Sequence, residues 1–137
     1  MQLRQTPGLP NPGLQPPTVA EPGDPFAQLR VVHLLARIPR GAPVRVRDIV
    51  DQLNVDYLDW SFSADVVVAA VIQLQANWLT DYRNSDGIML IDGADGPELT
   101  NEDSSRVDPW IVSQAERLAG ICREQLARYA VEEGGGA

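Results

Sequence analysis

The sequence has few of the side chains that catalysis and metal binding use. One histidine, His33, and one cysteine, Cys122, occur among 137 residues. Because His33 is the only histidine and lies within a predicted helix, neither a Ser-His-Asp triad nor a multi-histidine metal site can be assembled in one chain. Cys122 has no second cysteine with which to form an internal disulfide, and this fits a reducing compartment. We therefore predict no enzyme, no bound cofactor and no small-molecule substrate.

Positive charge is also scarce, and lysine is absent. Eleven cations, all arginine, stand against 19 acidic residues, which gives a formal net charge of -8. Because phosphate contacts need cations, this balance argues against a protein that holds nucleic acid by bulk electrostatics. No apolar run precedes Pro7, so we expect neither a signal peptide nor a membrane span, and we expect a cytoplasmic location.

Loops that bind phosphate or calcium are missing as well. The chain has no Gly-x-Gly-x-x-Gly and no Gly-x-x-x-x-Gly-Lys sequence, so nucleotide binding by either loop has no support. The acidic stretch from Asp92 to Glu98 lacks the alternating ligands of a twelve-residue calcium loop. We predict a solvated acidic loop in this part of the chain.

Proline and glycine mark off a leader from the part of the chain that can fold. Residues 1–24 are rich in both, and such a composition sustains neither helical nor ladder hydrogen bonds. We expect a flexible leader, interpreted as a tether in preference to a docking peptide in the polyproline conformation. Residues 132–137 are expected to form a flexible tail.

Hydrophobic periodicity between these two segments predicts a mostly helical α+β fold. Asp24 and Pro25 can cap and open a first helix. The stretch from Asn84 to Gly87 can turn between strands at 79–83 and 87–92. The predicted helices cover 26–38, 46–54, 63–77 and 108–131, with a core domain at 25–95, a hairpin at 79–92 and an acidic loop at 96–107.

This order of elements resembles the winged-helix superfamily over residues 26–92. Residues 42–50 look like the strand that leads into the second helix of that fold, and residues 74–79 look like the third helix passing into the wing. The resemblance implies a winged-helix core with a short β-hairpin wing, to which a long C-terminal helix is added. In DNA-binding members the third helix enters the major groove and a basic wing touches the backbone.

The predicted third helix and wing depart from this DNA-binding pattern. When residues 63–79 are wound as a helix, one face is apolar and is expected to be buried. Val68, Ile72 and Leu79 lie on this apolar face. The opposite arc has no arginine and consists of Asp65, Ala69, Gln73, Ala76 and Asn77. The wing region sets Arg83 against Asp81, Asp86, Asp92 and Asp95. We therefore predict a noncatalytic module that acts through protein–protein contacts, as an adaptor or assembly subunit.

A dimeric DNA-binding transcriptional regulator is the alternative. The first half of the chain has a local excess of arginine, and Arg40, Arg45 and Arg47 are its candidate phosphate contacts. Gln73 and Asn77 could present adjacent amides to adenine edges. The competing interpretation is that the arginines are solvated, pair with nearby carboxylates or bind an acidic protein surface.

Two apolar features are candidate contact surfaces. Trp60 and Phe62 lie in the connection between the second and third helices, which either packs under the final helix or presents a hot spot to another protein. The final helix has more apolar residues than a small core can cover from one side, so we predict a homodimer made partly through it. Its candidate contact residues are Trp110, Ile111, Leu118, Ile121 and Leu126.

Overall fold

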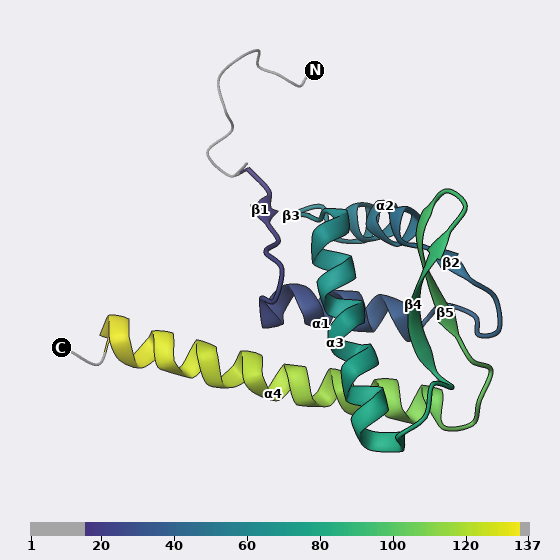
Figure 1. Ribbon diagram of the computed structural model, residues 1–137. Coiled ribbons are helices and arrows are strands. Elements are labelled where there is room, and N and C mark those ends of the chain that lie inside the picture. The colour runs from purple at the N-terminus through teal and green to yellow at the C-terminus, as the bar shows by residue number, and fades with distance from the viewer. Residues whose placement is uncertain (1–15, 135–137) are drawn as a thin grey trace, which may run out of the picture.

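The computed structural model describes residues 16–134, which form four helices and two small sheets (Figure 1). The helices are α1 (Pro25–Leu35), α2 (Val46–Asp56), α3 (Ala64–Tyr82) and α4 (Val107–Gly134). The strands are β1 (Thr18–Val19), β2 (Val44–Arg45), β3 (Trp60–Ser61), β4 (Ile88–Gly93) and β5 (Gly96–Asn101). The mostly helical α+β class predicted from the sequence is confirmed.

Helix α1 begins as its sequence predicts. The Asp24 carboxylate accepts a hydrogen bond from the Ala27 amide at 3.3 Å. Pro25 occupies the first turn, where its missing N–H removes no intrahelical bond. The helix runs between α2 and α4, and α3 crosses in front of it (Figure 1). This central position explains why Val31 and Leu35 are fully buried.

A three-stranded antiparallel sheet, in the order β2-β5-β4, packs against α2 and α3. Val44 of β2 pairs with Leu99 of β5, and Leu99 pairs on its other side with Leu90 of β4. The short strand that precedes α2 is therefore hydrogen-bonded to a strand about fifty residues further along the chain. This long-range pairing fixes the start of α2 against the β4–β5 hairpin.

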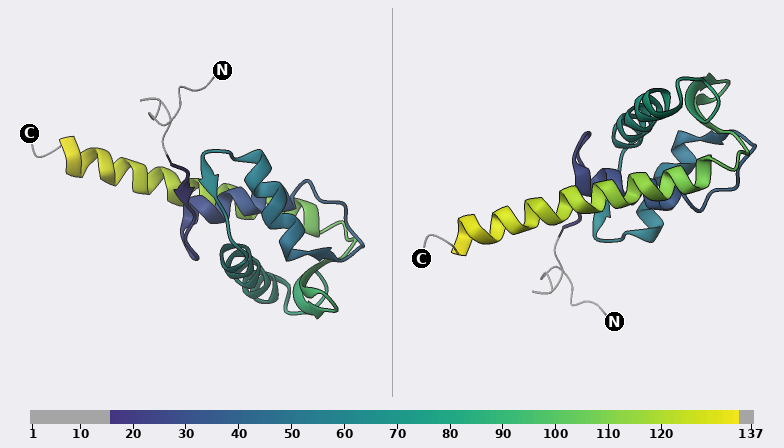
Figure 2. Two further views of the ribbon diagram at one scale, coloured as in Figure 1. Left: turned by 90° about the horizontal axis from the view of Figure 1, so that it is seen from above. Right: turned by 90° about the horizontal axis from the view of Figure 1, so that it is seen from below.

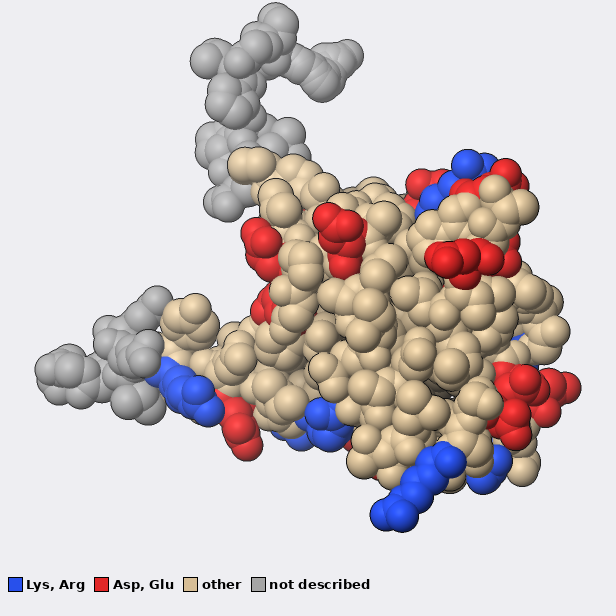
Figure 3. Space-filling model, viewed as in Figure 1, with Lys and Arg blue, Asp and Glu red and all other residues tan. Residues whose placement is uncertain are grey.

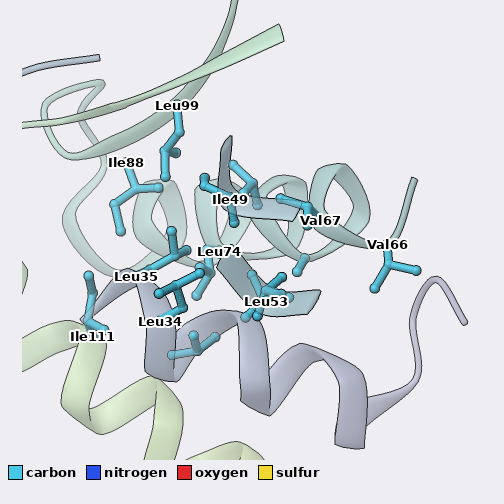
Figure 4. Packing of buried hydrophobic residues seen from close by; sticks show 14 of the residues in the cluster. Leu34, Leu35, Ile49, Leu53, Val66, Val67, Leu74, Ile88, Leu99 and Ile111 are labelled. Atoms are coloured by element: carbon cyan, nitrogen blue, oxygen red, sulfur yellow. The ribbon is translucent and has the colours of Figure 1, made fainter. Parts of the chain in front are cut away.

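The hydrophobic core lies where the sheet meets the helices. Ile88 and Leu99 extend from the sheet toward the helical layer (Figure 4). Each helix contributes fully buried side chains to the same cluster, so the core holds the sheet and the helices in one body. These helical residues include Leu35, Ile49, Leu53, Val67, Leu74 and Ile111.

The hairpin lies further along the chain than the sequence predicted. Residues 79–82 are the last turn of α3, and Arg83 ends the helix in the left-handed conformation at φ 57°. The predicted turn at 84–87 connects α3 to β4, and the predicted acidic loop at 96–107 begins with strand β5. Tertiary packing explains the longer helix, because the buried ring of Trp78 meets the ring of Trp110 from α4 edge-on, with a centroid distance of 5.1 Å.

The predicted limits of the two terminal segments also change. Within the leader expected at 1–24, strand β1 pairs in parallel with β3, and Ala20 is buried. The Thr18 amide donates to the Asp59 carbonyl at 2.9 Å, which satisfies a backbone group that a proline-rich segment would expose to water. Residues 1–15 lie outside the described residues. At the other end α4 continues to Gly134, into the segment expected to be a tail.

Candidate interaction surfaces

The outward face of α3 carries no charge over most of its length. Residues 66–80 contain no acidic or basic side chain. Ile72 is 52% exposed and Leu79 is 38% exposed, although helical winding had placed both with the buried residues. Figure 3 shows the face over α3 as a broad uncharged area with both acidic and basic groups at its borders. We call this face the α3 surface, consisting of Val68, Ala69, Ile72, Gln73, Ala76 and Leu79.

The two amides proposed for adenine recognition are engaged with each other. Gln73 Nε2 donates to Asn77 Oδ1 at 3.0 Å, and Asn77 Nδ2 donates to Gln114 Oε1 of α4 at 2.9 Å. Arg117 donates to the same Gln114 oxygen at 3.0 Å. Asn77 is therefore part of the contact between α3 and α4, whereas Gln73 remains exposed beside it. Asp65 is also exposed, in the first turn of α3.

Arg40 is a structural residue, contrary to its candidate role as a phosphate contact. Its side chain is only 7% exposed, and its Nε lies 2.9 Å from an oxygen of Asp108. Arg40 Nη1 also donates to the carbonyls of Leu35 and Ile38 at the end of α1. The guanidinium thus joins the end of α1 to the start of α4 and is not available to a large anionic ligand.

Of the other two candidate phosphate contacts, Arg45 lies near acidic groups of α2 and of the hairpin, and Arg47 is exposed. Arg45 Nε donates to Asp48 at 3.1 Å, and Arg45 Nη1 lies 3.9 Å from Asp95 at the hairpin tip. Arg47 is exposed in the first turn of α2. Asp92 and Asp95, on either side of the hairpin tip, are both exposed. This end of the molecule therefore carries both positively and negatively charged side chains.

The aromatic connection between α2 and α3 folds back on the chain. Phe62 is buried, and Asn54 of α2 holds its backbone by accepting from its amide at 2.8 Å and donating to its carbonyl at 3.2 Å. The Trp60 ring stacks on Phe62 with a centroid distance of 5.8 Å, and the Arg30 guanidinium covers Trp60 at 4.3 Å. Phe62 is thus unavailable as a partner surface, and Trp60 is half-buried beneath a cation.

The first half of α4 belongs to the core. Trp110 is buried, meets Trp78 edge-on at 5.1 Å and donates from Nε1 to Asp81 at 2.6 Å. Ile111 and Leu118 are buried as well. These three residues were predicted to contact a second copy, but they pack within their own chain, because α1 lies against this part of α4 and side chains of α3 contact Trp110.

The second half of α4 projects beyond the other elements (Figure 1). Ile121 is partly buried, whereas Leu126 and Tyr129 are each 57% exposed. Helix α1 runs antiparallel to α4, and its first residues lie near Cys122. The apolar side chains after this point therefore have no cover from α1. Of the five candidate dimer residues, Leu126 is the exposed one.

An open polar cleft separates the C-terminal part of α3 from α4. Its volume is about 270 Å³, and Asp81 and Arg117 give it one acidic and one basic side chain. The Asp81 carboxylate is held by Trp110, and the Arg117 guanidinium by Gln114. A second hollow of about 180 Å³ lies between α1, β2 and α2 and is lined mostly by apolar side chains. The one hydroxyl that lines the first cleft, that of Thr80, donates to the Ala76 carbonyl at 3.0 Å and not to the Asp81 carboxylate.

Two side chains have displaced pKa values. Hydrogen bonds from Arg37 and then Gln52 hold the pKa of the exposed Asp56 carboxyl below its ordinary value. Burial raises the pKa of the Cys122 thiol, and the nearby Asp24 carboxylate raises it further. Both shifts follow from packing and pairing, and a thiol with a raised pKa is a poorer nucleophile at neutral pH.

Within residues 16–134, no helix has the length and apolar content needed to span a membrane. The same residues contain no group of three or more His, Cys, Asp or Glu side chains that could hold a metal ion. Comparison with models of protein families, with curated proteins and with solved structures found no match.

Proposed function

We propose that the chain is a noncatalytic winged-helix module that acts through protein–protein contacts, one of them with a second copy of itself. The element order α1, β2, α2, α3, β4, β5 supports this class. The sheet order β2-β5-β4, in which the strand before α2 pairs with the second strand of the hairpin, supports it as well.

The α3 surface carries the functional part of the proposal. A helix that reads DNA presents polar side chains to base edges and is flanked by cations that contact phosphates. The α3 surface presents Ile72 and Leu79 instead, and the nearest acidic groups along the helix are Asp65 and Asp81. Removing such apolar side chains from water is favourable, so a protein partner fits this surface better than a polyanion does.

The state of the arginines supports the same choice. Of the three candidate phosphate contacts, Arg40 is buried and Arg45 is close to two carboxylates. Of these three, Arg47 is the one that is exposed and has no ion pair within residues 16–134. One such cation gives a weak electrostatic grip on a duplex at physiological salt.

Binding to a random DNA duplex tests the proposal directly. At physiological salt the unaltered protein is expected to show no binding by fluorescence anisotropy. Changing both Asp65 and Asp86 to arginine is expected to create weak binding that falls steeply with salt, because it reverses the field next to α3. Submicromolar binding of the unaltered protein to one duplex and not to its scrambled version would overturn the proposal. In that case Arg45→Ala with Arg47→Ala is expected to weaken binding and flatten its salt dependence.

Purification from native cells tests the protein contact itself. The variant Ile72→Glu is expected to lose the protein that copurifies with the unaltered chain, since it places a charge at the centre of the α3 surface. Val55→Glu is the matched control, because Val55 is a 67% exposed apolar residue on a different helix, α2. Equal retention of the partner by both variants would remove the α3 surface from the proposal.

A further inference from the structure

A second apolar stripe runs along α4, beside the face that packs on α1. Its members recur at alternating intervals of three and four residues, which is the spacing of a coiled-coil seam. Three large members are more than half exposed, with Val112 at 54% and Leu126 and Tyr129 at 57% each. We call this stripe the α4 seam, consisting of the exposed Val112, Leu126 and Tyr129, the partly exposed Ala115 and Ala119, and the buried Cys122 between them.

The three large exposed members of the α4 seam, Val112, Leu126 and Tyr129, have no cover from the rest of the described chain over more than half of their surface. Seen from below, α4 passes in front of the other elements along its whole length (Figure 2, right). Its second half extends past the start of α1, so that part of the helix has no neighbour on either side (Figure 1). A helical segment of about twelve residues is marginal in water without such a neighbour. A partner along the α4 seam would supply that packing.

We propose that the α4 seam binds the α4 seam of a second copy in an antiparallel arrangement centred between Gly120 and Ile121. The inference rests on the proposed function, because it assigns a surface and an orientation to the self-association included there. In this register Val107 of one copy lies beside Gly134 of the other, so the two helices overlap from end to end. The projecting half of each helix then packs against the half that belongs to the other copy's core.

The sizes of the side chains favour this orientation. The antiparallel register pairs Ala115 with Leu126 of the second copy, Ala119 with Cys122, and Val112 with Tyr129. Each small residue therefore meets a larger one. A parallel pair would place Ala115 and Ala119 opposite their own counterparts, and two successive alanine layers would leave the middle of the seam underpacked.

Charges beside the seam favour it as well. Glu116 and Arg123 are seven residues apart, and each directly follows a residue of the α4 seam. Both are exposed. Neither forms an ion pair among residues 16–134. In the antiparallel register Glu116 of each copy lies next to Arg123 of the other. A parallel pair would instead place Glu116 beside the apolar Ile111 and Arg123 beside the apolar Leu118 of the other copy.

Charge reversal measured by sedimentation equilibrium tests this arrangement. Glu116→Arg places two arginines side by side at each of two equivalent positions in the dimer. The repulsion is expected to raise the dissociation constant of the dimer about tenfold. Glu124→Arg makes the same change on the outward side of α4 and is expected to change it less than about twofold. The double variant Glu116→Arg with Arg123→Glu exchanges the charges and is expected to restore the unaltered affinity. Equal effects of Glu116→Arg and Glu124→Arg, or no restoration, would overturn the proposed pairing.

Distances between spin labels test the orientation independently, in a Cys122→Ala background. The antiparallel register separates the two copies of residue 113 by about 22 Å along the helix axis and those of residue 124 by about 10 Å, at 1.5 Å per residue. A parallel pair gives no axial separation at either site. A dimer with equal separations for Ser113→Cys and Glu124→Cys would overturn the register and leave the proposed function standing. A monomer at tens of micromolar would overturn both the register and the self-association, whereas DNA binding is judged by its own assay.

Discussion

Gly87 faces the ring of Trp78 so closely that no side chain fits at this position. A Cβ atom there would overlap the indole, and the backbone has a φ of 141°, which L side chains rarely adopt. The Gly87 carbonyl accepts a hydrogen bond from the Glu102 amide at 3.1 Å, which joins the entry of β4 to the exit of β5. The residue therefore sets the distance between α3 and the sheet.

Gly87→Ala is expected to destabilise the fold strongly for two reasons that can be separated. The strained backbone costs about 1–3 kcal/mol, and the overlap with the Trp78 ring adds about 1–3 kcal/mol. Gly96→Ala is the control, because Gly96 has a φ of 116° and nothing within 4 Å of an added Cβ. Urea unfolding of both variants measures the difference. Equal losses would show that the contact with Trp78 contributes nothing.

At the scale of elements, the sequence predicts the helices better than the hairpin. Helical periodicity and the Asp24 cap are local signals, and they correctly indicate four helices. The extent of α3 depends on packing instead, since Trp78 meets Trp110 of α4 only in the folded chain. The residues from Asn84 to Gly87 have turn chemistry, but a turn signal does not tell which strands it joins. Pro97 conceals strand β5, because proline is uncommon in a central strand.

The exposure of a candidate surface residue could be predicted from the sequence only where a single helix or strand determines it. Helical winding of residues 63–79 alone predicts that Asp65, Gln73 and Ala76 are exposed, and all three are exposed in the structure. The roles of Arg40 and Asn77 are set by Asp108 and Gln114 of α4, which are far away in the sequence. The parallel pairing of β1 with β3 is another long-range contact that no local pattern announces. Such contacts could not be inferred before the helices were placed relative to one another.

Removing the contact that Arg40 makes between α1 and α4 is expected to destabilise the protein. Arg40→Ala leaves the carbonyls of Leu35 and Ile38 without their guanidinium donor, at a cost of about 2–4 kcal/mol. Arg47→Ala removes the same charge from an exposed site, and its effect should stay within about 0.5 kcal/mol. Denaturant unfolding compares the two variants. If both lost the same stability, net charge and not the buried contact would be the cause.

For the whole molecule, the two halves of α4 differ in how far they are buried. Its first half completes the core, since Ile111 and Leu118 are buried. Its second half exposes Leu126 and Tyr129 beyond the start of α1. A chain that folded for its own stability alone would gain little from the second half. The division therefore predicts that folding and self-association can be separated by shortening one helix.

Ending the chain after Arg123 is expected to preserve the monomer and abolish the dimer. The deleted part includes Leu126 and Tyr129, whose exposed side chains add little to the core, so the free energy of unfolding of the monomer should change by no more than about 1 kcal/mol. The same deletion removes two of the large residues of the α4 seam. Ending the chain after Ser113 is the control, because it also removes the buried Leu118 and should cost several kcal/mol. Unfolding measured at concentrations below dimerisation, together with sedimentation at tens of micromolar, reports both properties. A chain ending at Arg123 that still dimerised with unaltered affinity would place the contact between copies elsewhere on the molecule.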